Sequence, residues 1–146
     1  MKSGLPGNPR VVLDTNTVIS AAISDDGTSY KVFELLLTGA IENITTKEII
    51  AEVKDVFSRP RISKLIGPED MNSFIQTFEK SSIKIEAISE FEAVPEDPDD
   101  NMILEAAVDG NADYILSWDN HLLQIGNFKG IKIITPKDFL LLFATN

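Results

Sequence analysis

The sequence contains no cysteine and a single histidine, His121, among its 146 residues. The absence of cysteine excludes disulfide bridges, thiolate zinc sites and cysteine nucleophiles. A lone histidine excludes a metal site built from several histidines and the histidine pair of a metalloprotease. We therefore expect any metal chemistry to come from carboxylates, whose oxygen atoms suit Mg²⁺, Mn²⁺ or Ca²⁺.

Long apolar runs and basic charge are also scarce. No apolar stretch approaches the ~20 residues of a membrane-spanning helix, and the first nine residues lack the apolar segment of a signal peptide. We therefore expect a cytoplasmic protein with no membrane partner. Asp and Glu number 23 and Lys and Arg 13, which gives a formal net charge of −10. This balance argues against binding nucleic acid through charge alone, but it leaves open a nuclease whose acids are neutralised by metal ions.

Proline and glycine are too few for a low-complexity chain, and the length fits one domain. We expect a flexible N-terminus over residues 1–9 and a single domain over residues 10–146. Apolar segments that predict buried strands alternate with segments of helical periodicity. The predicted strands are 10–14, 41–45, 83–85, 114–116 and 131–134, and the predicted helices are 18–23, 30–37, 45–59, 68–78, 99–109 and 135–142. This α/β alternation is typical of a three-layer α/β/α domain around a mostly parallel sheet.

Two aspartates directly follow short apolar strands. Asp14 follows Val11–Leu13, and Asp119 follows Tyr114–Ser117. Either one alone could be only a helix cap or a turn residue. However, the functional sites of parallel sheets lie at the carboxyl ends of the strands, where two such residues meet if their strands are neighbours. We therefore expect Asp14 and Asp119 at one rim of the sheet.

A third carboxylate is placed by helical periodicity. Residues 86–100 hold seven acids and no base, and this run ends at a predicted helix N-terminus, where acids are favoured by the helix dipole and by capping. That preference explains Asp97 and Asp99 without any function. Asp100, in contrast, lines up with Ile103 on the inward face of the helix, where a carboxylate needs a partner or a metal.

A fourth carboxylate belongs to the preceding helical segment. Thr45 and Glu48 have the spacing of a capping box, which predicts that Thr45 caps this helix. Glu52 lies at the edge of its apolar stripe and is the acid best placed to reach the sheet rim. Four carboxylates in one place repel one another and raise their pKa values. One or two Mg²⁺ or Mn²⁺ ions would remove that cost, and two such ions can promote phosphodiester hydrolysis.

Several short pieces occur in an order and spacing that match a known family. They are Val11-Val12-Leu13-Asp14-Thr15-Asn16, Ile49–Val53, Asp97–Asn101 with Leu104–Ala107, Ala112–Asp119 and Ile133–Pro136. With these pieces the chain resembles a PIN domain over roughly residues 10–142, in particular the branch related to VapC toxins. The resemblance implies a compact α/β/α fold and a metal-dependent endoribonuclease that uses Mg²⁺ or Mn²⁺.

The resemblance also implies roles for individual residues and partners. The catalytic and metal-binding residues would be Asp14, Glu52, Asp100 and Asp119, with accessory polar residues Asn16, Asp97 and Ser117. RNA would be the substrate, and the toxin branch implies a homodimer and an antitoxin partner. Arg59, Arg61 and Lys64 form a local basic cluster, which is either an RNA-binding surface or a solvated loop.

Two residues near Asp119 depart from the pattern of the family. Trp118 occupies a position where a small residue is usual, and its indole either stacks on a base or packs at the strand end. His121 follows Asp119 closely, and we interpret it as a surface residue.

The residues taken alone leave other functions open. Receiver-type phosphoryl-transfer modules and phosphatases also place acids with Mg²⁺ at strand ends. A receiver requires paired acids after its first strand and a lysine after a late strand, and Lys132 and Lys137 do not complete that pattern. A phosphatase nucleophile requires a second acid two residues after Asp14, where Asn16 lies. A third alternative is a PIN-like scaffold that binds RNA or a partner without catalysis, although the presence of all four acids argues against it.

Overall fold

The structure is a computed structural model that describes residues 8–24, 27–94 and 97–144. Residues 1–7 of the expected flexible N-terminus and Glu96 of the acidic run lie outside the described residues. Within the described ranges, no helix combines the length and the apolar character needed to cross a membrane.

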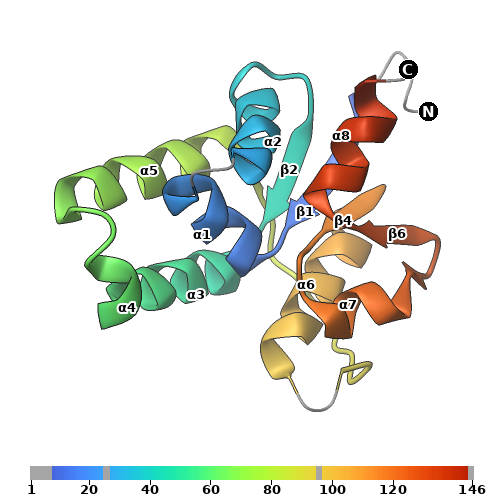
Figure 1. Cartoon of the computed structure of the whole chain (residues 1–146). Helices are drawn as coiled ribbons and strands as arrows, with labels where there is room; N and C mark the ends of the chain where they lie inside the picture. The colour runs from blue at the N-terminus through green and yellow to red at the C-terminus, as the bar shows by residue number, and fades with distance from the viewer. Residues whose placement is uncertain (1–7, 25–26, 95–96, 145–146) are drawn as a thin grey trace.

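The described residues form a six-stranded sheet at the centre of the molecule (Figure 1). The strands are β1 (Arg10–Leu13), β2 (Glu42–Thr45), β3 (Ile83–Lys84), β4 (Tyr114–Leu116), β5 (Asn127–Phe128) and β6 (Ile131–Ile134). Their order is β3-β2-β1-β4-β6-β5, and every pair is parallel except β5 with β6. The predicted mostly parallel sheet is confirmed, whereas the two-residue strand β5 was not predicted.

Helices cover both faces of this sheet. They are α1 (Thr15–Ile23), α2 (Thr28–Leu37), α3 (Lys47–Ser58), α4 (Pro60–Ser63), α5 (Pro68–Ser81), α6 (Pro98–Asp109), α7 (Asn120–Ile125) and α8 (Pro136–Ala144). Figure 1 shows α1, α2, α3 and α5 on one side and α6 and α7 on the other. Helix α6 packs against β1, β2 and β4, and α8 packs against α2. The expected three-layer α/β/α architecture is therefore confirmed, although the short helices α4 and α7 were not predicted.

The strand order opens a crevice beside the carboxyl ends of β1 and β4. The chain leaves β1 toward β2 and leaves β4 toward β6, which lie on opposite sides of the β1–β4 pair. Such a divergence of connections creates the usual binding crevice of a parallel sheet. The register of this pair runs up to Leu13 and Leu116. The next residues of both strands, Asp14 and Ser117, therefore lie at the crevice.

A buried amide holds the end of β1 in place. The Asn43 side chain accepts a hydrogen bond from the Leu13 N–H at 3.0 Å and donates one to Ser82 Oγ at 2.9 Å. Direct pairing of β1 with β2 reaches only Val11 and Asn43. The amide thus replaces a ladder hydrogen bond where the two strands separate, next to Asp14.

The start of α3 differs from the prediction. Thr46 caps the helix, and its Oγ1 accepts a hydrogen bond from the Ile49 N–H at 3.1 Å. The predicted capping box of Thr45 with Glu48 is wrong, because Thr45 is still the last paired residue of β2 and faces Lys84 on β3. One residue is needed to leave the strand before a helix can begin. The predicted apolar stripe of α3 is confirmed, since Ile49, Ile50, Val53, Val56 and Phe57 are all buried.

The acidic segment before α6 is pinned along that helix by side chains four residues apart. Asn101 makes two hydrogen bonds to the backbone of Val94, at 3.0 and 2.9 Å. Glu105 accepts one from the Phe91 N–H at 2.9 Å, and Asp109 accepts from the backbone N–H groups of residues 88 and 89. Residues one helical turn apart share a face, so α6 provides hydrogen-bond partners for the backbone of residues 88, 89, 91 and 94 in place of a neighbouring strand.

Candidate functional site

The crevice contains a cavity of about 240 Å³ that is lined by all four carboxylates singled out in the sequence. Asp14 and Asp119 reach it from the ends of β1 and β4, Asp100 from α6 and Glu52 from α3. Two of the proposed accessory residues, Asn16 and Asp97, also line it, and so do Arg59 and Arg61. Lys64 is not among the described residues that line this cavity.

Asp14 is buried and held by hydrogen bonds to both of its oxygens. Its Oδ1 accepts from the Thr17 N–H at 2.9 Å as the cap of α1, and its Oδ2 accepts from the Ser117 hydroxyl. Only 4% of Asp14 is exposed. Burial raises the pKa of its carboxyl, and the hydrogen bonds from Ser117 and Thr17 partly oppose that rise. The residue is thus fixed in position, but a nearby positive charge is needed to stabilise its ionised form.

Ser117 connects the two strand-end aspartates. Its buried hydroxyl donates to Asp14 and accepts from the backbone N–H of Asp119 at 2.9 Å. Asp119 in turn caps α7, and its Oδ1 accepts from the His121 N–H at 2.7 Å. Ser117 lines no part of the cavity itself, so within the described residues it acts as a support beneath the two aspartates.

Three aspartates of the site are also helix caps. Asp14 caps α1, Asp97 caps α6 and Asp119 caps α7, each through one carboxylate oxygen. These aspartates are therefore helix caps and members of the acidic site at the same time. The capping bond orients each carboxylate, and three helix N-termini stabilise the negative charge that gathers between them.

Asp100 is the least compensated acid of the site. It is only 6% exposed, and its Oδ2 has no hydrogen-bond partner among the described residues. Burial, followed by the charges of Asp119 and Asp97, raises the pKa of Asp100 to about 8. The predicted inward placement is confirmed, since Ile103 on the same face of α6 is also buried. A buried carboxylate oxygen without a donor is suited to contact a cation, which would offset the cost of burying its charge.

Glu52 forms a second acidic group on the α3 wall of the cavity. Burial, and then the neighbouring charge of Asp99, raises the pKa of Glu52. The Arg59 guanidinium opposes this rise, with its Nη2 3.9 Å from Glu52 Oε2 and 3.0 Å from Asp55 Oδ2. Asp99 also lines the cavity, although the sequence had assigned it only a helix-start role. Its position next to Asp100, on the first turn of α6, is the sequence feature that could have indicated that Asp99 lies at the site.

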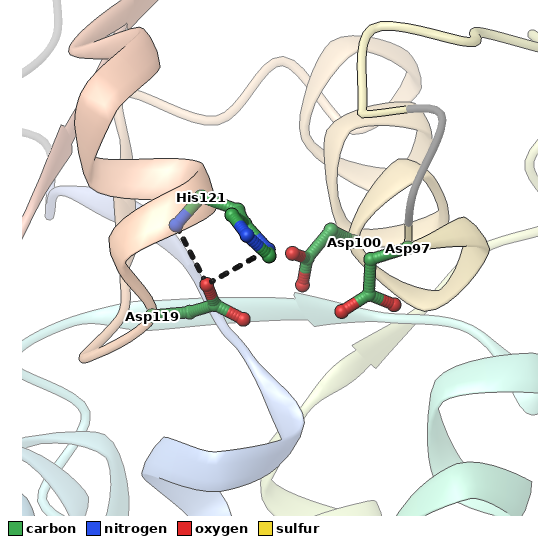
Figure 2. A group of neighbouring side chains, drawn as sticks. All are labelled: Asp97, Asp100, Asp119 and His121. Atoms are coloured by element: carbon green, nitrogen blue, oxygen red, sulfur yellow. Dashed lines mark hydrogen bonds and ion pairs between the residues drawn. The ribbon is translucent and has the colours of Figure 1, made fainter.

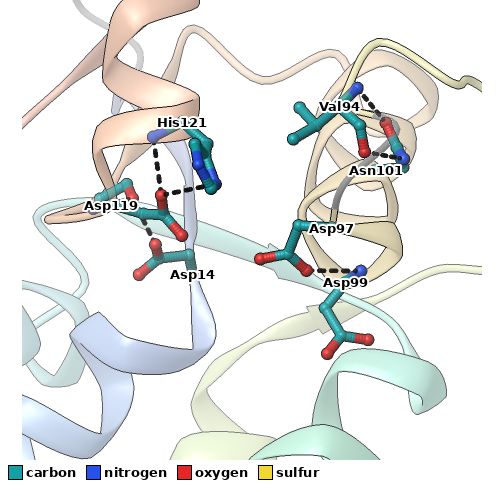
Figure 3. A network of polar contacts seen from close by, with 8 residues as sticks. Asp14, Val94, Asp97, Asp99, Asn101, Asp119 and His121 are labelled. Carbon is teal, nitrogen blue, oxygen red and sulfur yellow. Dashed lines mark hydrogen bonds and ion pairs between the residues drawn. The ribbon is translucent and has the colours of Figure 1, made fainter.

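Four side chains on the other wall form a compact cluster of candidate metal ligands. Asp97, Asp100, Asp119 and His121 each offer a ligand atom, and these atoms lie within 4.8 Å of one another (Figure 2). Figure 3 shows that this cluster continues to Asp14 on one side and to the Asn101–Val94 hydrogen bonds on the other. His121 was interpreted as a surface residue. Its side chain is indeed 49% exposed, but it is part of the cluster.

Trp118 fits the predicted alternative in which its indole packs at the strand end. Its Nε1–H donates to the Ser29 hydroxyl on α2 at 3.1 Å, and within the described residues it does not line the carboxylate cavity. The residue as a whole remains 40% exposed.

The donor set fits a divalent cation. The cavity gathers carboxylate oxygens in excess of its cationic groups, and the buried Oδ2 of Asp100 has no hydrogen-bond donor among the described residues. Oxygen-rich sites of this kind suit Mg²⁺ and Mn²⁺. Asp14, Glu52, Asp97, Asp100 and Asp119 are the residues that could hold such an ion.

The fold and the site define a three-layer α/β/α protein with an acidic centre suited to a divalent cation. The chain matches the PIN domain family over residues 10–121. It is also 31% identical over 140 residues to an uncharacterized protein of Methanocaldococcus jannaschii, with 90% of this chain and 89% of the relative covered. The chain therefore belongs to the PIN domain family, whose members are generally metal-dependent nucleases.

Proposed function

We propose that this PIN-domain protein is an endoribonuclease that hydrolyses RNA phosphodiester bonds and acts in the cytoplasm. Its metal-binding and catalytic residues are Asp14, Glu52, Asp100 and Asp119, and its cofactor is Mg²⁺ or Mn²⁺. The observation that carries this proposal is the convergence of these four carboxylates in one cavity, with the buried Oδ2 of Asp100 left without a partner.

The protein's own side chains supply orientation and substrate contacts. Ser117 donates to Asp14 and accepts from the Asp119 backbone, so it holds two carboxylates in a fixed relation. Arg59 and Arg61 line the cavity, where their guanidinium groups can hold phosphates of the RNA backbone. A divalent ion bound by the carboxylates would supply the charge that activates water and stabilises the leaving oxygen.

An RNA cleavage assay tests this function. Purified protein is incubated with a mixture of RNAs, with Mn²⁺, with Mg²⁺ or with EDTA, and the products are mapped by sequencing. We expect internal cleavage that depends on the metal and is abolished in Asp14→Asn, while circular dichroism shows an intact fold. Unchanged cleavage by Asp14→Asn would refute the catalytic assignment. Metal-dependent RNA binding without cleavage by the wild type would favour the non-catalytic scaffold instead.

We further propose that the protein is the toxin of a toxin–antitoxin pair and works as a homodimer. The resemblance of the sequence to the branch related to VapC toxins supports this role. Induced expression in a bacterial host should arrest growth, and expression of Asp14→Asn should not. Sedimentation of the purified protein tests the dimer, and co-purification with the product of the neighbouring reading frame tests the antitoxin. Normal growth with active protein in the cells would contradict the toxin role.

A further inference from the structure

The geometry around His121 is close to that of a metal ligand. Ligands about 2.1 Å from a common ion lie at most about 4.2 Å apart. The candidate ligand atoms of Asp97, Asp100, Asp119 and His121 lie within 4.8 Å of one another. The separations in the cluster therefore exceed this limit by at most about 0.6 Å, a difference within the reach of small side-chain rotations. The half-exposed imidazole has the freedom to make such a rotation.

The backbone holds His121 in this place. Its N–H donates to Asp119 Oδ1 at 2.7 Å, and its Nδ1 lies 3.8 Å from the same oxygen. Figure 2 shows the imidazole pointing toward Asp100 and Asp119. A separate feature of the same cluster fits a cation, because the Oδ2 of Asp100 is buried without a hydrogen-bond partner among the described residues.

Building on the proposed metal-dependent function, we propose that His121 is a direct ligand of the ion held by Asp97, Asp100 and Asp119. A nitrogen ligand makes this site prefer transition ions such as Mn²⁺, Co²⁺ or Ni²⁺ over Mg²⁺. Imidazole suits first-row transition metals, whereas Mg²⁺ selects oxygen ligands in octahedral geometry. Glu52 lies outside this cluster. The nitrogen ligand of His121 therefore belongs to the α6–α7 wall of the cavity and not to the α3 wall, where Glu52 lies.

Calorimetric titration of tag-free protein with Ni²⁺, Mn²⁺ and Mg²⁺ tests this assignment. The variant His121→Phe keeps a ring at the position but removes both nitrogens. Gln124→Ala is the matched control, because Gln124 is also exposed on α7 but lies outside the cluster. We expect His121→Phe to lose about tenfold or more in Ni²⁺ affinity. Its Mg²⁺ affinity should stay within about twofold of the wild type, because Mg²⁺ does not depend on the nitrogen.

A spectroscopic measurement separates a ligand from a positioning residue. In pulsed electron paramagnetic resonance, Mn²⁺ bound to the wild type should show modulation from a directly coordinated nitrogen, and this signal should vanish in His121→Phe. Equal Ni²⁺ affinities of the wild type and His121→Phe, or a parallel loss of both metals, would overturn the proposal. If Asp100→Asn then still abolishes binding, the carboxylate site of the proposed function stands. If the wild type binds no divalent metal, both proposals fail.

Discussion

Removing the charge of Asp100 should change how the stability of the metal-free protein depends on pH. The folded pKa of Asp100 is raised to about 8 from an ordinary 3.8, so between these values the folded protein binds a proton that the unfolded chain does not. The free energy of unfolding therefore falls as pH rises through this window. Asp100→Asn cannot ionise and should not show this fall.

The magnitude follows from the size of the shift. The rise of the pKa from 3.8 to about 8, at about 1.4 kcal/mol for each tenfold change in proton affinity, sets an upper limit of about 6 kcal/mol. Asp119, with 22% of its side chain exposed, can swing outward and relieve part of the repulsion. We therefore expect a net difference on the order of 3 kcal/mol between the two proteins above pH 8, growing from nearly none at about pH 3.8 and already on the order of 1 kcal/mol at pH 5.

Urea denaturation in excess EDTA, at pH 5, 6.5 and 8.5, measures this difference. Asp70→Asn is the control, because Asp70 follows Pro68 on the first turn of α5 just as Asp100 follows Pro98 on the first turn of α6. Asp70 is exposed, so its substitution should leave the pH profile parallel to that of the wild type. Parallel profiles for Asp100→Asn and the wild type would refute the account of Asp100 as an uncompensated buried acid.

Two further predictions concern the segment pinned along α6. Hydrogen bonds from Ser89 lower the pKa of Asp109, so Asp109 stabilises the fold above pH 4 and loses this contribution as pH falls. Asp109→Asn should therefore lower the melting temperature at pH 7. A difference between the variant and the wild type that stays constant down to pH 3 would contradict this explanation. Asn101→Ala leaves the buried backbone N–H of Val94 without its partner, whereas the Val94 C=O keeps the hydrogen bond from the Asp97 N–H at 3.1 Å. It should cost about 2 kcal/mol in urea denaturation, and a change below about 0.5 kcal/mol would show that water replaces the amide.

Much of the sheet and three of the candidate site residues followed from local patterns. The strands that precede Asp14 and Asp119 are short and apolar, so the sequence predicted both strand ends. The periodicity of α6 placed Asp100 on the buried face. These features are local, because each depends only on residues within a few positions along the chain.

The remaining features depend on contacts between distant segments. Thr45 fits a capping box by spacing, but its pairing with β3 keeps it in the strand and shifts the cap to Thr46. His121 and Asp97 are 24 positions apart and meet only because α6 and α7 cover the same face of the sheet. Contacts of this kind are invisible to local patterns.

The most direct test of the central claim is a thermal melt at neutral pH with and without millimolar Mn²⁺. Binding at about 100 times the dissociation constant stabilises the fold by about 2.7 kcal/mol, a shift on the order of 5–10 °C for a domain of this size. We expect this shift for the wild type and for Asp70→Asn, and its loss in Asp100→Asn relative to that variant's own metal-free melt. An equal Mn²⁺ shift in the wild type and Asp100→Asn would contradict a metal site at the four converging carboxylates.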